Sequence, residues 1–140
     1  MIFQTNFQCK VQHKKMIVPS ISNIRASIAD NNKLITEMNK FILDNYQKPG
    51  DYLNEHRLIS TILDYKRKVV SNAWIIQGML WCYLLNGGEK CKGKKFWLYV
   101  KLYTHRKIIK ESVEIIRMLK HRLMQLQMLM NPLGFFSARK

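Results

Sequence analysis

Residues 69–88 read VVSNAWIIQGMLWCYLLNGG and contain no charged side chain over twenty positions. An apolar stretch of this length is either a helix buried in a protein core or a helix that crosses a bilayer. Polar side chains at Ser71, Asn72 and Gln77 are costly in lipid. We therefore favour a buried core helix, and we keep a membrane-associated helical subunit that inserts around residues 69–85 as an alternative.

Residues that cap or break helices divide the chain into three helical segments around this stretch. Ser20 or Ser22 is suited to cap the first segment, and Asp51 is suited to cap the second. The segments are ended by turn-forming residues, which are Pro49, Gly50, Gly87, Gly88, Asn131 and Pro132. Gly93 marks a loop before the third segment.

Apolar residues recur with the 3-4 spacing of a helix in all three segments. Polar residues lie in the same seams at Asn31, His105 and Ser112. We interpret His105 as a core histidine with a hydrogen-bond partner, in preference to a metal ligand or a catalytic base. The apolar positions are Ile21, Ile24, Ile28, Ile35, Met38 and Ile42, then Ile59, Ile62, Val69, Ala73, Ile76, Leu80 and Tyr83, then Leu98, Leu102, Ile109, Ile116, Leu119, Leu123, Leu126 and Met130.

These segments predict an all-α fold, an elongated antiparallel bundle of three long helices with a basic N-terminal arm. The 140 residues suit one domain, and short connections make consecutive helices antiparallel. At about 1.5 Å per residue, the helix over residues 51–85 would be roughly 50 Å long. We assign residues 1–19 to the arm, residues 20–131 to the bundle and residues 132–140 to a C-terminal tail.

The charge balance points to a polyanionic partner. The chain has 24 Lys and Arg against 9 Asp and Glu, a formal net charge of +15. Self-repulsion of this size destabilises the isolated chain, so a partner that neutralises it is expected. Nucleic acid, an anionic membrane and an acidic protein surface are the three candidates.

The positive charge is densest in residues 88–110, where four aromatic residues, Phe96, Trp97, Tyr99 and Tyr103, lie among basic ones. Cations attract phosphates, and flat rings stack on bases or lie among lipid headgroups. Only one acid, Glu89, lies in this window. The eight basic residues, which we predict to contact nucleic-acid phosphates, are Lys90, Lys92, Lys94, Lys95, Lys101, Arg106, Lys107 and Lys110.

From these residues we expect a non-enzymatic structural protein that binds nucleic acid, either RNA or DNA, within a larger assembly of the ribonucleoprotein or nucleocapsid type. Lys10, Lys14 and Lys15 would form a second basic arm. No arrangement of side chains nominates a catalytic residue, a cofactor or a metal site. The alternatives are the membrane-associated subunit and a helical adaptor.

The adaptor alternative rests on the apolar C-terminal end of the chain. Such surfaces commonly dock on a partner protein or on a second copy. The predicted contact residues are Leu129, Met130, Leu133, Phe135 and Phe136.

Two further features of the sequence have both a structural and a functional interpretation. Residues 88–95, GEKCKGKK, fit the first seven positions of the phosphate-binding P-loop, but Lys95 replaces the Ser or Thr that holds magnesium. We interpret them as a basic loop between helices. Asp30, Glu37 and Asp44 form a stripe that either is solvated or faces basic residues of the third segment.

The three cysteines are Cys9, Cys82 and Cys91. Their odd number and irregular spacing argue against a secreted disulfide framework and favour an intracellular, reducing compartment, with an organelle or a virion as further candidates. Cys82 and Cys91 lack the paired spacing of a metal site, and we interpret Cys82 as a small core residue.

Overall fold

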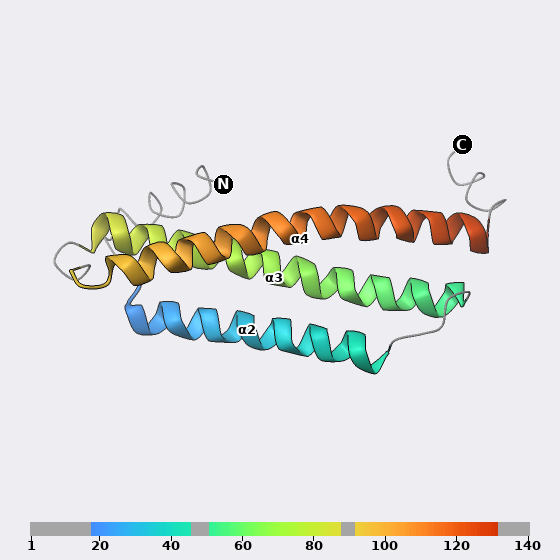
Figure 1. Cartoon of the computed structure of the whole chain (residues 1–140), viewed down its shortest axis with the longest axis horizontal. Helices are drawn as coiled ribbons and strands as arrows, with labels where there is room; N and C mark the ends of the chain where they lie inside the picture. The colour runs from blue at the N-terminus through green and yellow to red at the C-terminus, as the bar shows by residue number, and fades with distance from the viewer. Residues whose placement is uncertain (1–17, 46–50, 88–91, 132–140) are drawn as a thin grey trace.

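The structure, a computed structural model, describes residues 18–45, 51–87 and 92–131. It contains α2 (Ile21–Asp44), α3 (Tyr52–Asn86) and α4 (Lys95–Met130), and no strand occurs in these ranges. The three helices lie side by side, with α3 between α2 and α4 (Figure 1). The predicted all-α, elongated antiparallel bundle is confirmed, and α4 with its 36 residues is about 54 Å long. The basic arm and the C-terminal tail lie outside the described residues, apart from residues 18 and 19.

The helices begin at the predicted caps. The Ser20 hydroxyl accepts a hydrogen bond from the Asn23 N–H at 3.0 Å, and the Asp51 carboxylate accepts one from the Asn54 N–H at 3.3 Å. Each such cap stabilises a helix by about 1 kcal/mol. Gly93 precedes α4 with a φ of 81°, a conformation that strongly favours glycine.

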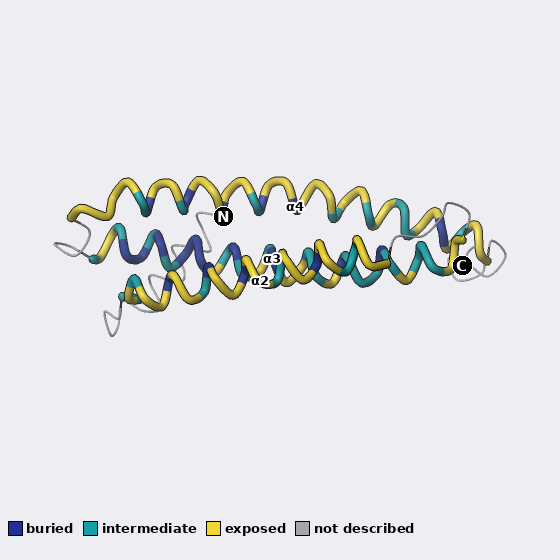
Figure 2. The backbone as a smooth tube through the Cα atoms, turned by 60° about the horizontal axis from the view of Figure 1, so that its bottom comes forward, coloured by how far each residue is buried: buried dark blue, intermediate teal, exposed yellow. Residues whose placement is uncertain are grey.

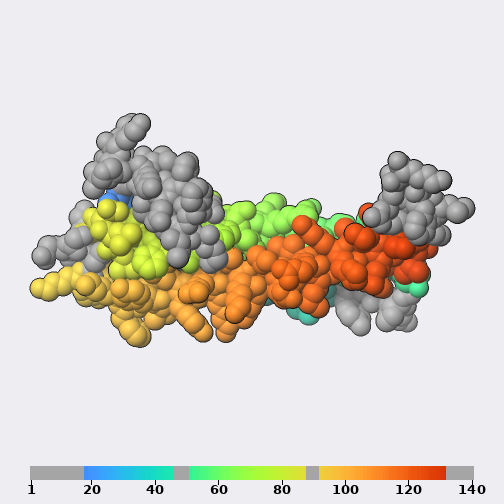
Figure 3. Space-filling view, turned by 90° about the horizontal axis from the view of Figure 1, so that it is seen from above, coloured from blue at the N-terminus to red at the C-terminus, as the bar shows by residue number. Residues whose placement is uncertain are grey.

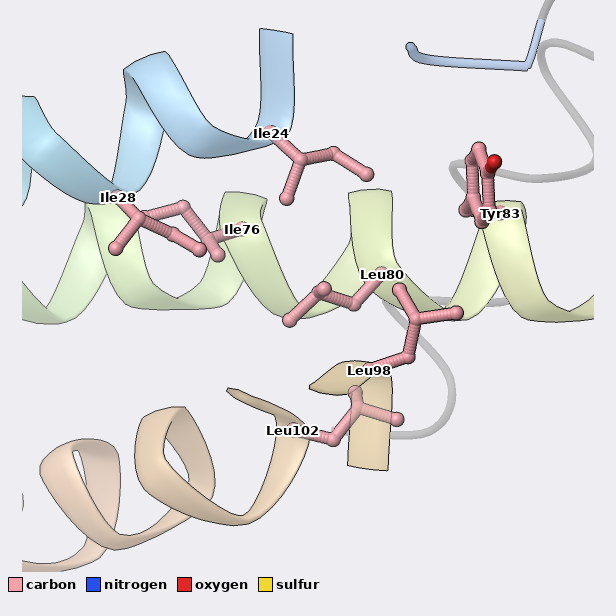
Figure 4. Close-up of a cluster of buried hydrophobic side chains, with 7 residues drawn as sticks. All are labelled: Ile24, Ile28, Ile76, Leu80, Tyr83, Leu98 and Leu102. Carbon is pink, nitrogen blue, oxygen red and sulfur yellow. The ribbon is translucent and has the colours of Figure 1, made fainter. Parts of the chain in front are cut away.

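The core that joins all three helices lies where α3 ends and α2 and α4 begin. Ile28 of α2 and Ile76 of α3 point toward each other, and Leu80 of α3 lies near Leu98 of α4 (Figure 4). These side chains are buried, and each contributes about 1.5–3 kcal/mol through removal from water. The cluster consists of Ile24, Ile28, Ile76, Leu80, Tyr83, Leu98 and Leu102.

A second core lies at the opposite end of the bundle and joins α3 to α4. Leu126 of α4 packs there with Ile59 and Leu63 of α3. An ion pair beside it links the same two helices, since Arg122 donates from Nε and Nη2 to the two carboxylate oxygens of Glu55 at 2.6 and 3.0 Å. The hydrogen bond from Arg122 lowers the pKa of Glu55.

Asn31 is the polar contact that aligns α2 with α3. Its side chain is buried, donates to the Val69 carbonyl at 3.3 Å and accepts from the Asn72 amide at 3.3 Å. A buried amide is costly without partners, and a shift of one helix along the other would remove both of these bonds. Asn31 therefore favours one register over its neighbours, as buried asparagines do in coiled coils.

The acidic stripe of α2 is a solvated surface. Asp30, Glu37 and Asp44 are all exposed, and none forms an ion pair with a described residue of α4. The reason is the arrangement of the helices, because α3 lies between α2 and α4 over most of their length (Figure 1).

The charge-free stretch forms the C-terminal half of α3. Val69, Ala73 and Ile76 are buried there, on the helix that packs against both neighbours. Among the helices of the described residues, none is long and apolar enough to span a bilayer.

We predict that Leu80→Ala destabilises the bundle by about 2–5 kcal/mol, because it removes buried methyl groups and leaves a cavity between three helices. Leu80 is 0% exposed, whereas Leu85 on the same helix is 64% exposed. Leu85→Ala is the matched control and should change the free energy of unfolding by less than about 0.5 kcal/mol. Urea unfolding followed by circular dichroism measures both, and equal losses would contradict the placement of this core.

Candidate nucleic-acid interface

Positive charge is concentrated on one helix of the bundle. In α2 three basic residues balance three acidic ones, so the helix has no net charge. In α3 four basic residues against two acidic ones leave +2, and in α4 eight against two leave +6. Among these three helices, α4 therefore has the most positive electrostatic potential.

The face of α4 that points away from α3 carries most of this charge. Leu98, Leu102 and Ile109 are buried on the inner side, and helical spacing turns their neighbours outward. The helix is exposed along this outer edge (Figure 2). We define the outer face by its exposed residues Lys95, Phe96, Tyr99, Tyr103, Arg106, Lys107 and Lys110.

The basic residues of the outer face are mostly free to meet an external anion. The Nζ atom of Lys107 lies 3.9 Å from Oε1 of Glu111, and both side chains are well exposed. This ion pair is weak because solvent screens it. Lys95, Arg106 and Lys110 form no ion pair with a described acid. Further along, Arg117 pairs with Glu114 at 3.2 Å, which reduces the positive potential beyond Lys110.

The basic turn before α4 extends the outer face to the end of the bundle. Lys92 and Lys94 are exposed there, directly before Lys95. Lysines at the N-terminus of a helix are repelled by the positive end of the helix dipole. The first turn of α4 contains no acidic residue, and the Lys94 side chain makes no capping hydrogen bond. An anion bound at this end would relieve that repulsion.

Lys101 lies apart from the exposed predicted contact residues of α4, and its contact with nucleic acid stays a prediction. Its side chain is half-buried on the side of α4 toward α2, with Nζ 6.0 Å from the Trp97 ring centroid. Arg25 of α2 lies 5.3 Å from the same ring. Sequence reasoning missed Arg25, because no local pattern connects it to Trp97.

Four predicted contact residues lie outside the described residues. They are Lys90 of the basic loop and Leu133, Phe135 and Phe136 of the apolar end. Leu129 and Met130 are exposed at the end of α4, so partner binding through this end stays a prediction. The element before the P-loop-like segment is α3, a helix, whereas a P-loop follows a strand.

His105 is confirmed as a core histidine. Its ring is buried in the inner side of α4, and Nδ1 lies 2.7 Å from the Lys101 carbonyl oxygen, to which the protonated nitrogen donates. Burial lowers the pKa of His105, because the charged ring loses its hydration. The hydrogen bond to Lys101 opposes this shift, and the positive charge of Lys101 adds to it.

Cys82 is buried and forms a disulfide, and both other cysteines lie outside the described residues. The intracellular, reducing compartment expected from the cysteine count stays a prediction. No group of three His, Cys, Asp or Glu in the described ranges is placed to hold a metal ion.

Comparison with known proteins found no match among family models, curated proteins or solved structures. The candidate interface therefore rests on the geometry and charge of this chain alone.

We predict that the stability of the bundle falls as the pH drops below about 6.5, the ordinary pKa of histidine. The unfolded chain takes up a proton on His105 in that range, whereas burial holds the folded pKa lower, so protons favour unfolding. His105→Asn keeps a donor near the Lys101 carbonyl and should reduce this loss. Urea unfolding at a series of pH values measures it.

The matched control is His121→Asn, because His121 is exposed on the same helix. This variant should keep the pH dependence of the natural chain. A His105→Asn variant with unchanged pH dependence would contradict the assignment.

Proposed function

We propose that this chain is a non-enzymatic structural protein that binds nucleic-acid phosphates through the outer face of α4, within a larger assembly of the ribonucleoprotein or nucleocapsid type. The observation that carries the proposal is the partition of charge, in which α4 has a net charge of +6 while α2 has none. Most of the cations on the outer face have no acidic partner among the described residues, so phosphates are their natural counterions.

The shape of the bundle supports a structural role. An elongated helix presents its cations in a row along about 20 Å between Lys95 and Lys110, from the rise per residue. A row of this kind follows a phosphate backbone without reading base edges, so binding would be largely independent of sequence. The affinity would come from the release of condensed counterions and would fall steeply with salt.

The described groups whose pKa is shifted lie away from the outer face of α4. The described groups with a shift are His105 in the core and the Glu55–Arg122 ion pair. Burial explains the lowered pKa of His105, and the mutual hydrogen bonds explain the pKa shifts of Glu55 and Arg122. We therefore assign the outer face to binding.

The test removes three cations from the outer face, in the variant Arg106→Gln/Lys107→Gln/Lys110→Gln. Each lost phosphate contact should reduce the slope of log affinity against log salt by about 0.7 on a single strand, so the slope should fall by about 2. Fluorescence anisotropy with labelled RNA and DNA at several salt concentrations measures affinity and slope together.

The control removes three exposed cations from other faces, in the variant Lys33→Gln/Lys40→Gln/Arg57→Gln. It lowers the net charge by the same amount but leaves α4 intact. It should keep most of the slope. An equal loss in both variants would contradict the proposal, because net charge and not the outer face would then set the affinity.

A further inference from the structure

We infer that the outer face of α4 binds single-stranded nucleic acid in preference to duplex, by stacking bases on Phe96, Tyr99 and Tyr103 among the cations. This inference rests on the proposed function and adds that the preferred nucleic acid is single-stranded. Exposed rings gain little from phosphate, so phosphate binding alone does not account for them. Unpaired bases offer flat faces on which such rings stack.

The three rings are exposed although they lie on a long, well-packed helix. Phe96 is 82% exposed, Tyr99 56% and Tyr103 68%. Their separations of three and four residues place them along one side of the helix, at successive rises of about 4.5 and 6 Å. Adjacent bases of an extended strand can meet successive rings at separations of this order.

Cations continue the same side of the helix directly after the rings. Tyr103, Arg106, Lys107 and Lys110 line a hollow of the surface, and Glu111, Glu114 and Ile115 line the rest of it. The first half of α4, coloured yellow to orange, forms one long edge of the molecule, from which side chains project with gaps between them (Figure 3). The rings thus lie between Lys95 and the later cations of the outer face, so a single strand can place its bases on the rings and its phosphates on the cations at either end.

Trp97, in the same part of α4, is an aromatic residue whose position is explained by packing within the bundle. It packs against the three-helix core, and Arg25 and Lys101 lie near its ring. Phe96, Tyr99 and Tyr103 have no stacking or cation contact of this kind with a described residue. Packing within the bundle thus explains Trp97 and leaves the outer rings unexplained.

A duplex would not use these rings. Its bases are stacked inside and offer only their edges in the grooves, which are read by hydrogen-bonding side chains. An intact duplex would meet the cations alone, so the rings would add nothing to its binding.

The test compares four probes on the full chain by anisotropy and sedimentation. They are a single-stranded oligonucleotide, its duplex, a strand of equal length made of abasic sites, and vesicles that contain phosphatidylserine. The variant is Phe96→Ala/Tyr99→Ala/Tyr103→Ala. The control is Leu43→Ala/Tyr52→Ala/Leu53→Ala, which removes three exposed apolar side chains from α2 and α3.

We expect the ring variant to bind the single strand at least about tenfold more weakly, because each stacked base contributes about a fivefold or larger factor. Its duplex affinity and its salt slope should stay near those of the natural chain. The natural chain should also bind the abasic strand more weakly than the strand with bases. The control should match the natural chain on every probe.

The contrary results separate the inference from the proposed function. Equal binding of the single strand by the ring variant and the natural chain would overturn the inference, while salt-dependent binding would still support the outer face as a phosphate site. Loss of vesicle binding in the ring variant without loss of strand binding would assign the rings to lipid and also overturn it. Absence of binding to every nucleic acid at low salt would overturn both.

Discussion

The whole structure depends on α3 being buried on two sides at once. Its C-terminal half carries no charge and packs against α2 through Ile76 and against α4 through Leu80. A helix that is apolar on two sides needs two neighbours, so α2 and α4 flank it. This arrangement leaves the far side of α4 in solvent, where polar and charged side chains keep their hydration.

The arrangement also decides where the charge of the chain accumulates. The buried half of α3 has no room for cations, and α2 balances its own. The excess is therefore carried by α4, and within its first half by residues that have few acidic partners. Like charges in a row repel one another, and the repulsion is tolerated at the surface because water and salt screen it. A bound polyanion neutralises these cations in place of salt, and the release of its condensed counterions stabilises the complex.

Local sequence signals predicted the helices well because caps, breakers and apolar spacing act over a few residues. Ser20 and Asp51 begin their helices as expected, and Asn31 and His105 lie in the core among apolar residues. The first helix ends earlier than its breakers implied, at Asp44, where the Asn45 side chain donates to the Phe41 carbonyl and competes with continuation of the helix.

Contacts between distant residues could not be predicted from local spacing. The position of Lys101 depends on its rotation about α4 and on the approach of Arg25 from another helix. The ion pair of Glu55 and Arg122 is a long-range contact of the same kind. The candidate site was thus predicted in its composition, whereas its division into an outer face and a packed side required the fold.

NMR chemical shifts of the labelled chain, followed during titration with a single-stranded oligonucleotide, map the binding surface residue by residue. We predict that shifts concentrate on residues 92–110 at the outer face, including the ring protons of Tyr99 and Tyr103, while the core side chains of Leu80 and Leu98 keep theirs. Shifts confined to α2, or spread evenly over all exposed cations, would contradict this prediction.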